Sequence, residues 1–173
     1  MNSHDGLKDA LTNLASPTLL YEELRRELAR AKRSGVGFCA MKIILRIDVD
    51  KKSLPVTPES DVHRDFRISS LSERETLIFS RTLSNETRGE DICARMGGSE
   101  FLLLMQDFSL AHDVFIDRLV RQWTRQRAID PRLSSVTAPR LEFSVALSRT
   151  DEGSLDFLNR LDLEPILVLS PIQ

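Results

Sequence analysis

Apolar residues recur at helical spacing in several parts of the chain. Ser16-Pro17 places a capping residue before a proline at the first helical position, and leucines then recur at intervals of four until Gly35 ends the pattern. This spacing predicts a helix over 17–34. Further helices are predicted over 73–86, after a capping box at Ser72 and Glu75, over 110–127, with Ser109 as its cap, and over 154–161.

The apolar segments between these helices are short and rich in β-branched or aromatic residues, which favours strands. Strands are predicted over 36–49, 91–96, 100–105, 141–147 and 165–169. Residues 51–70 contain two prolines and no apolar period, so they are expected to form a loop, with 51–64 as an insertion. Helices that alternate with strands, without a repeat, predict one α/β (α+β) domain over 1–173, with a central sheet flanked by helices.

Composition and charge exclude several classes of protein. The 173 residues are 41% hydrophobic, which suffices for one sizeable core, and 24 basic against 26 acidic residues favour no nucleic-acid partner. No apolar run approaches the roughly 20 residues of a membrane span, and the N-terminus lacks a signal peptide, so we expect a cytoplasmic domain. Cys39 and Cys93 lie in apolar segments without metal-ligand spacing, which predicts buried, reduced thiols.

Only seven glycines occur in the chain, and two of them are adjacent. Gly97-Gly98 separates the predicted strands 91–96 and 100–105. This arrangement predicts a β-hairpin whose turn requires positive φ. The hairpin is the sharpest local signal in the sequence.

The segment Arg95-Met96-Gly97-Gly98-Ser99-Glu100-Phe101 resembles the signature hairpin of the GGDEF family, the bacterial diguanylate cyclase domain, with Ser in the third place. Asp9 to Leu14 is similar to the family's opening D-x-L-T-x-L. Arg88 to Asp91, separated from the glycine pair by five residues, matches the RxxD site at which the family binds cyclic di-GMP. The resemblance spans about 9–150 and implies a single palm-like domain with a mostly antiparallel sheet.

The resemblance also implies where catalysis would occur. Its catalytic hairpin would be Gly97, Gly98, Ser99, Glu100 and Phe101. The family's metal ligands fall on Glu100 and on Asp48 at the end of the first strand, or on Asp50 if the register slips. Ser99 stands where the family has a further acidic ligand, and hard cations prefer carboxylates, so Mg²⁺ is expected only if GTP binds.

Other substrate contacts of the family are also replaced. Its guanine-binding Asn falls on Arg64, which can only donate, and its second guanine contact falls on Glu73. The last predicted helix lacks the Lys that reaches the triphosphate, and Arg160 is the residue that could imitate it. These coordinated losses predict a retired catalytic site.

The RxxD site keeps its chemistry. Arg88 can donate to a phosphate or to guanine, Asp91 can accept from guanine N1 and N2, and Arg118 is the arginine that the resemblance adds. We therefore expect cyclic di-GMP as ligand at Arg88, Asp91 and Arg118. The alternative is an ordinary surface ion pair.

Three hypotheses follow for function. The favoured one is a degenerate GGDEF domain in cyclic di-GMP signalling, either a receptor or a regulatory and dimerisation module that acts as a homodimer or with a partner signalling domain. The second is a weakly active, homodimeric diguanylate cyclase that converts two GTP into cyclic di-GMP. The third is a protein-interaction domain without nucleotide, in which Phe115, Trp123 and the proline-containing insertion would matter most.

Overall fold

Four helices and five strands make up the part of the chain that the computed structural model describes, residues 6–47, 61–106 and 112–169, with 61–64 described by their backbone. In chain order they are α1 (Pro17–Ser34), β1 (Cys39–Arg46), α2 (Asp61–Glu86), β2 (Ile92–Gly97), β3 (Glu100–Met105), α3 (His112–Ala128), β4 (Arg140–Leu147), α4 (Ser154–Leu163) and β5 (Leu167–Leu169). Most of these elements coincide with the predicted ones.

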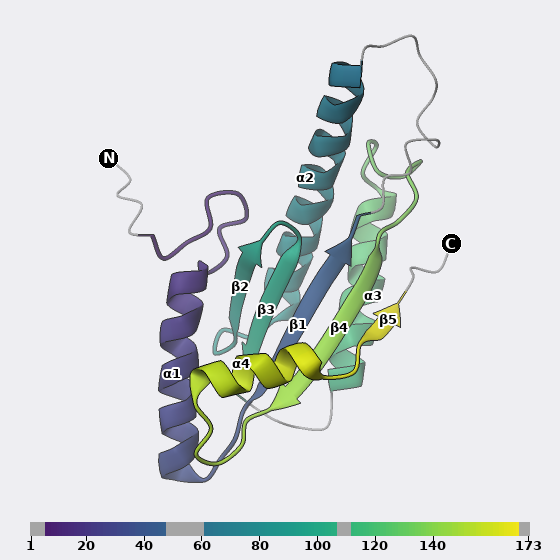
Figure 1. Ribbon diagram of the computed structural model, residues 1–173. Coiled ribbons are helices and arrows are strands. Elements are labelled where there is room, and N and C mark those ends of the chain that lie inside the picture. The colour runs from purple at the N-terminus through teal and green to yellow at the C-terminus, as the bar shows by residue number, and fades with distance from the viewer. Residues whose placement is uncertain (1–5, 48–60, 107–111, 170–173) are drawn as a thin grey trace.

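β1 lies in the middle of a single sheet (Figure 1). The strand order is β2-β3-β1-β4-β5, and every neighbouring pair is antiparallel. β1 pairs with β3 from Cys39 to Ile44 and with β4 from Cys39 to Arg46. The predicted α+β class with a mostly antiparallel central sheet is confirmed.

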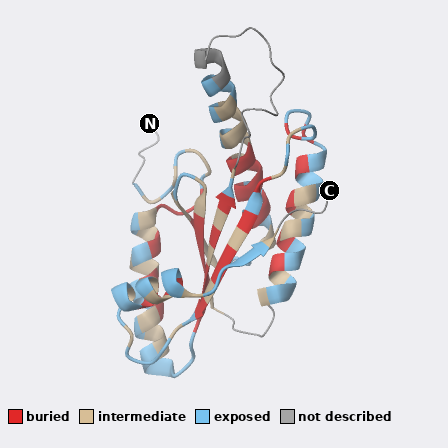
Figure 2. Ribbon diagram, turned by 45° about the vertical axis from the view of Figure 1, so that its right-hand side comes forward, coloured by how far each residue is buried: buried red, intermediate tan, exposed pale blue. Residues whose placement is uncertain are grey.

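The two faces of the sheet carry two separate apolar layers, because side chains along a strand alternate between its faces. Met41, Ile43 and Leu45 of β1 pack in one layer with α2 and α3, whereas Ala40 belongs to the layer under α1 and α4. Figure 2 shows the buried residues concentrated in the strands and on the helix faces turned toward them. The molecule therefore has three layers, with helices on both sides of the sheet.

α1 and α4 cover only part of their face. α4 crosses the sheet at the N-terminal half of β1, so the helices leave uncovered the region where β1 ends beside the β2–β3 hairpin (Figure 1). Ile44 in this region is partly exposed and Arg46 is exposed. An open end of a central strand is the architectural feature that positions the candidate site.

The local signals for α1 are confirmed. The Ser16 hydroxyl accepts a hydrogen bond from the Leu19 N–H at 3.3 Å, and Gly35 ends the helix with φ of 70°. On α3, Leu119 and Trp123 are fully buried and Phe115 is partly buried against the same core, as the apolar spacing predicted. Ser109, the expected cap of this helix, lies outside the described residues.

The prediction for residues 61–70 is wrong. They belong to α2, which begins at Asp61 rather than at residue 73, so the capping box at Ser72 and Glu75 does not start a helix. This first part of α2 extends beyond the sheet, and Phe66 there is 74% exposed (Figure 1). An exposed helix segment carries no apolar period, so the sequence pattern did not reveal it. It is helical because it extends the packed turns that follow it in α2. The rest of the predicted insertion, residues 51–60, lies outside the described residues.

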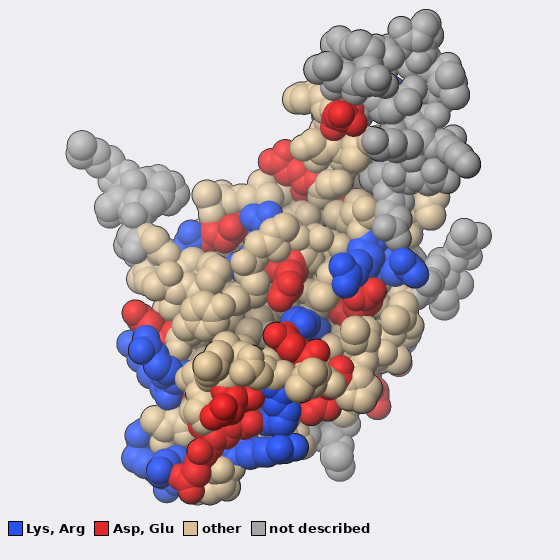
Figure 3. All heavy atoms as spheres, in the orientation of Figure 1, with Lys and Arg blue, Asp and Glu red and all other residues tan. Residues whose placement is uncertain are grey.

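Both cysteines are free thiols, as predicted. Burial raises the pKa of Cys39 and of Cys93 to about 12, so both stay protonated near neutral pH. Within the described ranges, none of the helices is both long and apolar enough to cross a membrane. On the face shown in Figure 3, basic and acidic side chains are interspersed, in keeping with the nearly balanced charge of the chain.

A buried ion pair joins α2 to α3. Arg127 Nε donates to Glu75 Oε1 at 2.6 Å, and Arg127 also donates to the Val136 carbonyl. Burial raises the pKa of Glu75, and the guanidinium of Arg127 opposes this rise. The second carboxylate oxygen of Glu75, Oε2, is buried and has no hydrogen-bond partner among the described residues. Removing the arginine would leave an uncompensated carboxylate in the core.

We predict that Arg127→Met lowers the free energy of unfolding by about 3–5 kcal/mol, because it strands one charge of a buried pair. Chemical denaturation measures the change. Burial raises the pKa of Glu75 above its value in the unfolded chain, so protonation of Glu75 favours the folded state. The loss of unfolding free energy in Arg127→Met should therefore be smaller at about pH 5 than at about pH 8.

The matched control is Arg125→Met, at an exposed position of the same helix, which should change stability by no more than about 0.5 kcal/mol. Equal stability losses in the two variants would show that the pair with Glu75 has no special role.

Candidate functional site

The β2–β3 turn is built on two glycines with positive φ. Gly97 has φ of 142° and Gly98 has φ of 51°, and the β2–β3 register shifts between Arg95 and Gly97. A Cβ added at either glycine would meet nothing within 4 Å. The backbone conformation, rather than crowding within this chain, is therefore what requires glycine here.

The hairpin is attached directly to β1. The Leu45 N–H donates to the Ser99 carbonyl at 2.9 Å, and Ile44 lies opposite Glu100. Opposed residues of an antiparallel pair project on the same face. Glu100 therefore belongs to the partly uncovered face of the sheet, and it is half-buried there.

Phe101 has a different role from its neighbour. It is fully buried on the opposite face, and its ring centroid lies 5.1 Å from that of Phe79 in α2. Of the predicted catalytic residues, Phe101 is thus a core residue that fixes the hairpin. Gly98 and Ser99 line the cleft described next.

A cleft of about 540 Å³ lies between the hairpin, the end of β1 and α2. Its polar lining includes Arg46, Arg95, Ser99 and Glu73. Arg46 projects on the same face as Ile44 and forms an ion pair with Glu142 of β4, Nε to Oε2, at 3.0 Å. An arginine therefore occupies the strand-end position beside the glycine turn.

The described residues of this cleft do not fit a Mg²⁺ site. A hard cation needs several carboxylate or carbonyl oxygens, whereas Glu73 is the acidic residue among those lining the cleft and two arginines accompany it. Nowhere within residues 6–47, 65–106 and 112–169 do three His, Cys, Asp or Glu side chains gather as metal ligands would. Asp48 and Asp50, the strand-end acids of the sequence prediction, lie outside the described residues.

The groups expected to hold GTP are only partly brought to the cleft. Glu73 lines it, as the resemblance implied, whereas the side chain of Arg64 lies outside the described part. Arg160 is not among the lining residues, and it binds Glu152 through Nη2 at 2.7 Å and the Leu147 carbonyl at 2.6 Å. Arg160 therefore anchors α4 through Glu152 and the Leu147 carbonyl.

The N-terminal motif, residues 9–14, contacts the hairpin through an ion pair between Asp9 and Arg95. The Asp9 carboxylate accepts from the Thr12 N–H at 2.8 Å, from the Thr12 hydroxyl at 2.7 Å and from Arg95 Nη1 at 3.1 Å. Arg95 Nε also donates to the Gly98 carbonyl at 2.9 Å. Burial alone would raise the pKa of Asp9, but the hydrogen bonds from Thr12 and the charge of Arg95 hold it below its usual value.

The RxxD segment forms a tight turn rather than a turn of helix. α2 ends at Glu86, the Asp91 N–H donates to the Arg88 carbonyl at 3.1 Å, and the Arg88 N–H donates to Asp91 Oδ2 at 3.0 Å. Burial raises the pKa of Asp91, and the hydrogen bond from the Arg88 N–H opposes this. The two residues line one pocket of about 380 Å³, together with Lys8, Asn13, Ser84 and Thr87.

Arg118 lies near this turn but points to another partner. Its Nε donates to Glu86 Oε2 at 2.6 Å, its Nη2 donates to the Glu86 carbonyl at 2.9 Å, and its guanidinium lies over the Phe115 ring. Arg118 is not among the residues lining the pocket. The structure thus brings Arg88 and Asp91 together, whereas Arg118 of α3 is bound to Glu86 at the end of α2, two residues before Arg88.

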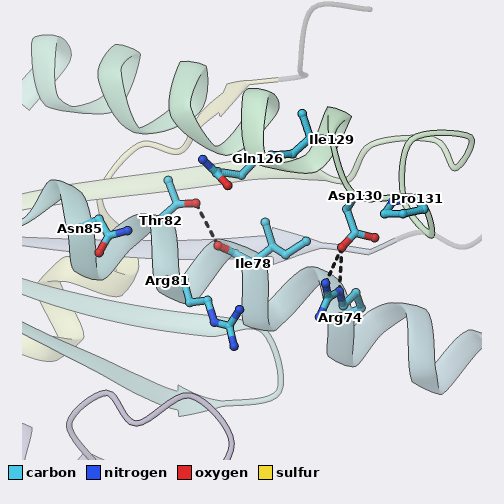
Figure 4. A pocket seen from close by; sticks show the side chains of 9 residues that line it. All are labelled: Arg74, Ile78, Arg81, Thr82, Asn85, Gln126, Ile129, Asp130 and Pro131. Atoms are coloured by element: carbon cyan, nitrogen blue, oxygen red, sulfur yellow. Dashed lines mark hydrogen bonds and ion pairs between the residues drawn. The ribbon is translucent and has the colours of Figure 1, made fainter.

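A groove between α2 and α3 lies outside both predicted sites (Figure 4). Arg74 and Asp130 form an ion pair at 2.6 Å at one end of it, and Asn85 lines it farther along α2. Burial alone would raise the pKa of Asp130, but the hydrogen bonds from Arg74 lower it. In Figure 4 the Arg81 guanidinium points away from α3, so the basic groups do not converge on one point.

Sequence reasoning missed Arg46 and Lys8. The signal for Arg46 was its place at the end of a buried strand, directly before the predicted strand-end acids in the sequence. Nothing in the sequence indicated that Lys8 would lie beside Arg88, because the two are 80 residues apart and meet only through the sheet.

Comparison with models of known protein families and with curated proteins finds no match. Solved structures do match the fold. The diguanylate cyclase SiaD from Pseudomonas aeruginosa, solved with its activator SiaC, is 24% identical with a TM-score of 0.72. That match covers 91% of this chain and 56% of the SiaD chain, so the present chain spans little more than half of SiaD.

Two isolated GGDEF domains match over nearly their whole length. The domain of DgcB from Caulobacter crescentus, solved with c-di-GMP, is 18% identical with a TM-score of 0.67, covering 94% of this chain and 87% of that one. The domain of YfiN (TpbB) from Pseudomonas aeruginosa is 20% identical with a TM-score of 0.63, covering 90% and 84%. The chain has the α+β fold of the GGDEF diguanylate cyclase domains, as its glycine hairpin predicted.

Proposed function

We propose that this chain is a catalytically degenerate GGDEF domain in cyclic di-GMP signalling, which binds cyclic di-GMP through Arg88 and Asp91 instead of producing it. The observation that carries the proposal is the contrast between two sites. At the glycine hairpin, the described cleft is lined by Arg46, Arg95 and the neutral Ser99, with Glu73 as the acidic residue among them. At the RxxD turn, a cation and a carboxylate line one pocket.

The ligand's chemistry matches the turn. Cyclic di-GMP offers two phosphodiester anions and two guanines. An arginine can bind a phosphate or the guanine O6 and N7 edge with paired donors, and an aspartate can accept from guanine N1 and N2. The Asp91 carboxylate takes backbone hydrogen bonds from Arg88 and Gln106, and since a carboxylate has about four acceptor sites, it can still accept from a base. Arg118 is the further cation of this proposed site, and it is bound to Glu86 in the structure.

The hairpin cleft is poorly equipped for phosphoryl transfer. That reaction needs metal ions to neutralise charge that develops on the phosphates. Arg46 is bound to Glu142, Ser99 is neutral, and Arg160 is engaged at Glu152. As part of the same proposal, the domain acts in the bacterial cytoplasm, as a homodimer or beside a partner signalling domain.

One observation favours a second candidate, the weakly active diguanylate cyclase. Gly97 and Gly98 keep the open turn that lets a triphosphate approach, and Glu100 lies on the partly uncovered face of the sheet. In this candidate, catalysis would use a metal held by Glu100 and Asp48 in a homodimer with one GTP on each protomer.

We predict that Arg88→Ala weakens cyclic di-GMP binding at least about tenfold, because a charge-assisted hydrogen bond contributes about 1.5–3 kcal/mol. Isothermal titration of the purified chain with cyclic di-GMP, and with GTP alongside, measures the affinity. Arg33→Ala, an exposed arginine at the far end of α1, is the matched control and should bind as the wild type does. A wild-type chain that binds no cyclic di-GMP would remove the receptor role.

The affinity should also depend on pH through Asp91. The deprotonated carboxylate is the form that accepts from guanine, so affinity falls as the pH is lowered through the pKa of Asp91. Because burial raises this pKa above the ordinary 3.8, the loss begins at a higher pH than for a solvated aspartate. Titrations of wild type and Asp91→Asn between about pH 4 and 8 test this, and the two profiles should differ. Identical profiles would show that Asp91 does not contact the ligand.

For the hairpin, we predict no cyclic di-GMP from GTP with Mg²⁺ or Mn²⁺, and no gain in Ser99→Asp, because the positive charge of Arg46 remains. The double variant Arg46→Asp with Ser99→Asp should bind Mn²⁺ where wild type does not, as measured by calorimetry. Product from the wild type that increases in Ser99→Asp would instead support the weakly active cyclase.

A further inference from the structure

The pocket at the RxxD turn is formed by two segments that are far apart in sequence. One is the turn itself, with Arg88 and Asp91. The other is the N-terminal segment, which contributes Lys8 and Asn13. We propose that Lys8, not Arg118, supplies the second cation of this site and binds a phosphodiester of cyclic di-GMP. This inference rests on the proposed function.

The backbone around Lys8 is fixed to the sheet. Lys8 and Ala15 form an antiparallel bridge, and Ala15 in turn bridges to Ala94 of β2. The Ala15 N–H donates to the Cys93 carbonyl at 2.9 Å, and the Arg95 N–H donates to the Ala15 carbonyl at 3.1 Å. The backbone of Lys8 is therefore held beside the RxxD turn before any ligand binds, so that only its exposed side chain has to become ordered on binding.

The lining of the pocket suits a nucleotide. Leu14, Leu19 and Ile92 offer apolar surface to the face of a base, while the hydroxyls of Ser84 and Thr87 lie among the polar groups. The volume of about 380 Å³ lies within the range of small-molecule sites. Cyclic di-GMP carries two phosphodiester charges, and the pocket has two cationic side chains, Lys8 and Arg88.

Arg118 is less suited to this pocket. Its guanidinium is engaged by both the side chain and the carbonyl of Glu86, and by the ring of Phe115. To reach a ligand beside Arg88 it would have to give up these contacts. Within the described residues, Lys8 has no ion pair to give up, since none of the salt bridges there includes it.

The test compares single variants by isothermal titration with cyclic di-GMP at two salt concentrations. We expect Lys8→Ala to weaken binding about five- to twentyfold and Lys8→Glu to weaken it further. Lys8→Arg should bind as the wild type does, because it keeps the positive charge. The loss of affinity on adding salt should be smaller in Lys8→Ala than in wild type, since one fewer charge is screened. Lys32→Ala, which removes an exposed lysine at the other end of α1, should leave binding unchanged.

The outcomes separate this inference from the proposed function. Wild type that binds cyclic di-GMP, with full affinity in Lys8→Ala and reduced affinity in Arg118→Ala, would overturn the role of Lys8 and leave the receptor function standing. No binding by the wild type would overturn the receptor function itself. Circular dichroism of each variant shows whether it is folded, and Lys8→Arg tests the charge with the least change to the structure.

Discussion

The fold depends on the burial of β1 between two strands and two helical layers. Ala40, Met41, Ile43 and Leu45 are fully buried, and full burial of a side chain the size of Met or Leu contributes about 1.5–3 kcal/mol. On the face under α1 and α4, α4 crosses the first half of the strand, and none of the described helices crosses the second half there (Figure 1). The open end of β1 and the hairpin bonded to it through Leu45 therefore form the hairpin cleft.

Arginines that could have served a substrate are used to hold this framework together. Arg95 ties the N-terminal segment to the glycine turn, Arg46 is paired with Glu142, Arg160 anchors α4 and Arg118 is held by Glu86. Of these arginines, Arg46 and Arg95 line the hairpin cleft and give it positive charge, whereas Arg160 and Arg118 are not among its lining residues. At the RxxD turn, Arg88 and Asp91 line a pocket that the N-terminal segment completes.

Features that depend on interactions between neighbouring residues were predicted from the sequence. The cap at Ser16, the left-handed Gly35 and the glycine turn at Gly97 and Gly98 each depend on a few neighbouring residues, and each was predicted correctly. The first turns of α2 were missed because Asp65, Phe66 and Arg67 there are exposed, and an exposed segment carries no apolar period. The capping residue expected at Ser72 lies inside that helix, since residues before it continue the same hydrogen-bonded backbone.

By itself, the sequence determined the α+β class, the strands and the resemblance to a GGDEF hairpin with Ser99 in place of an acid, since these follow from the order and spacing of residues along the chain. The tertiary structure decided which side chains share a site. It placed Arg46 in the lining of the hairpin cleft, paired Arg160 with Glu152 outside that lining, and placed Lys8 in the same pocket as Arg88. Such neighbours are set by strand register and by the path of the N-terminal segment over the sheet, which join residues tens of positions apart and leave no periodic trace in the sequence.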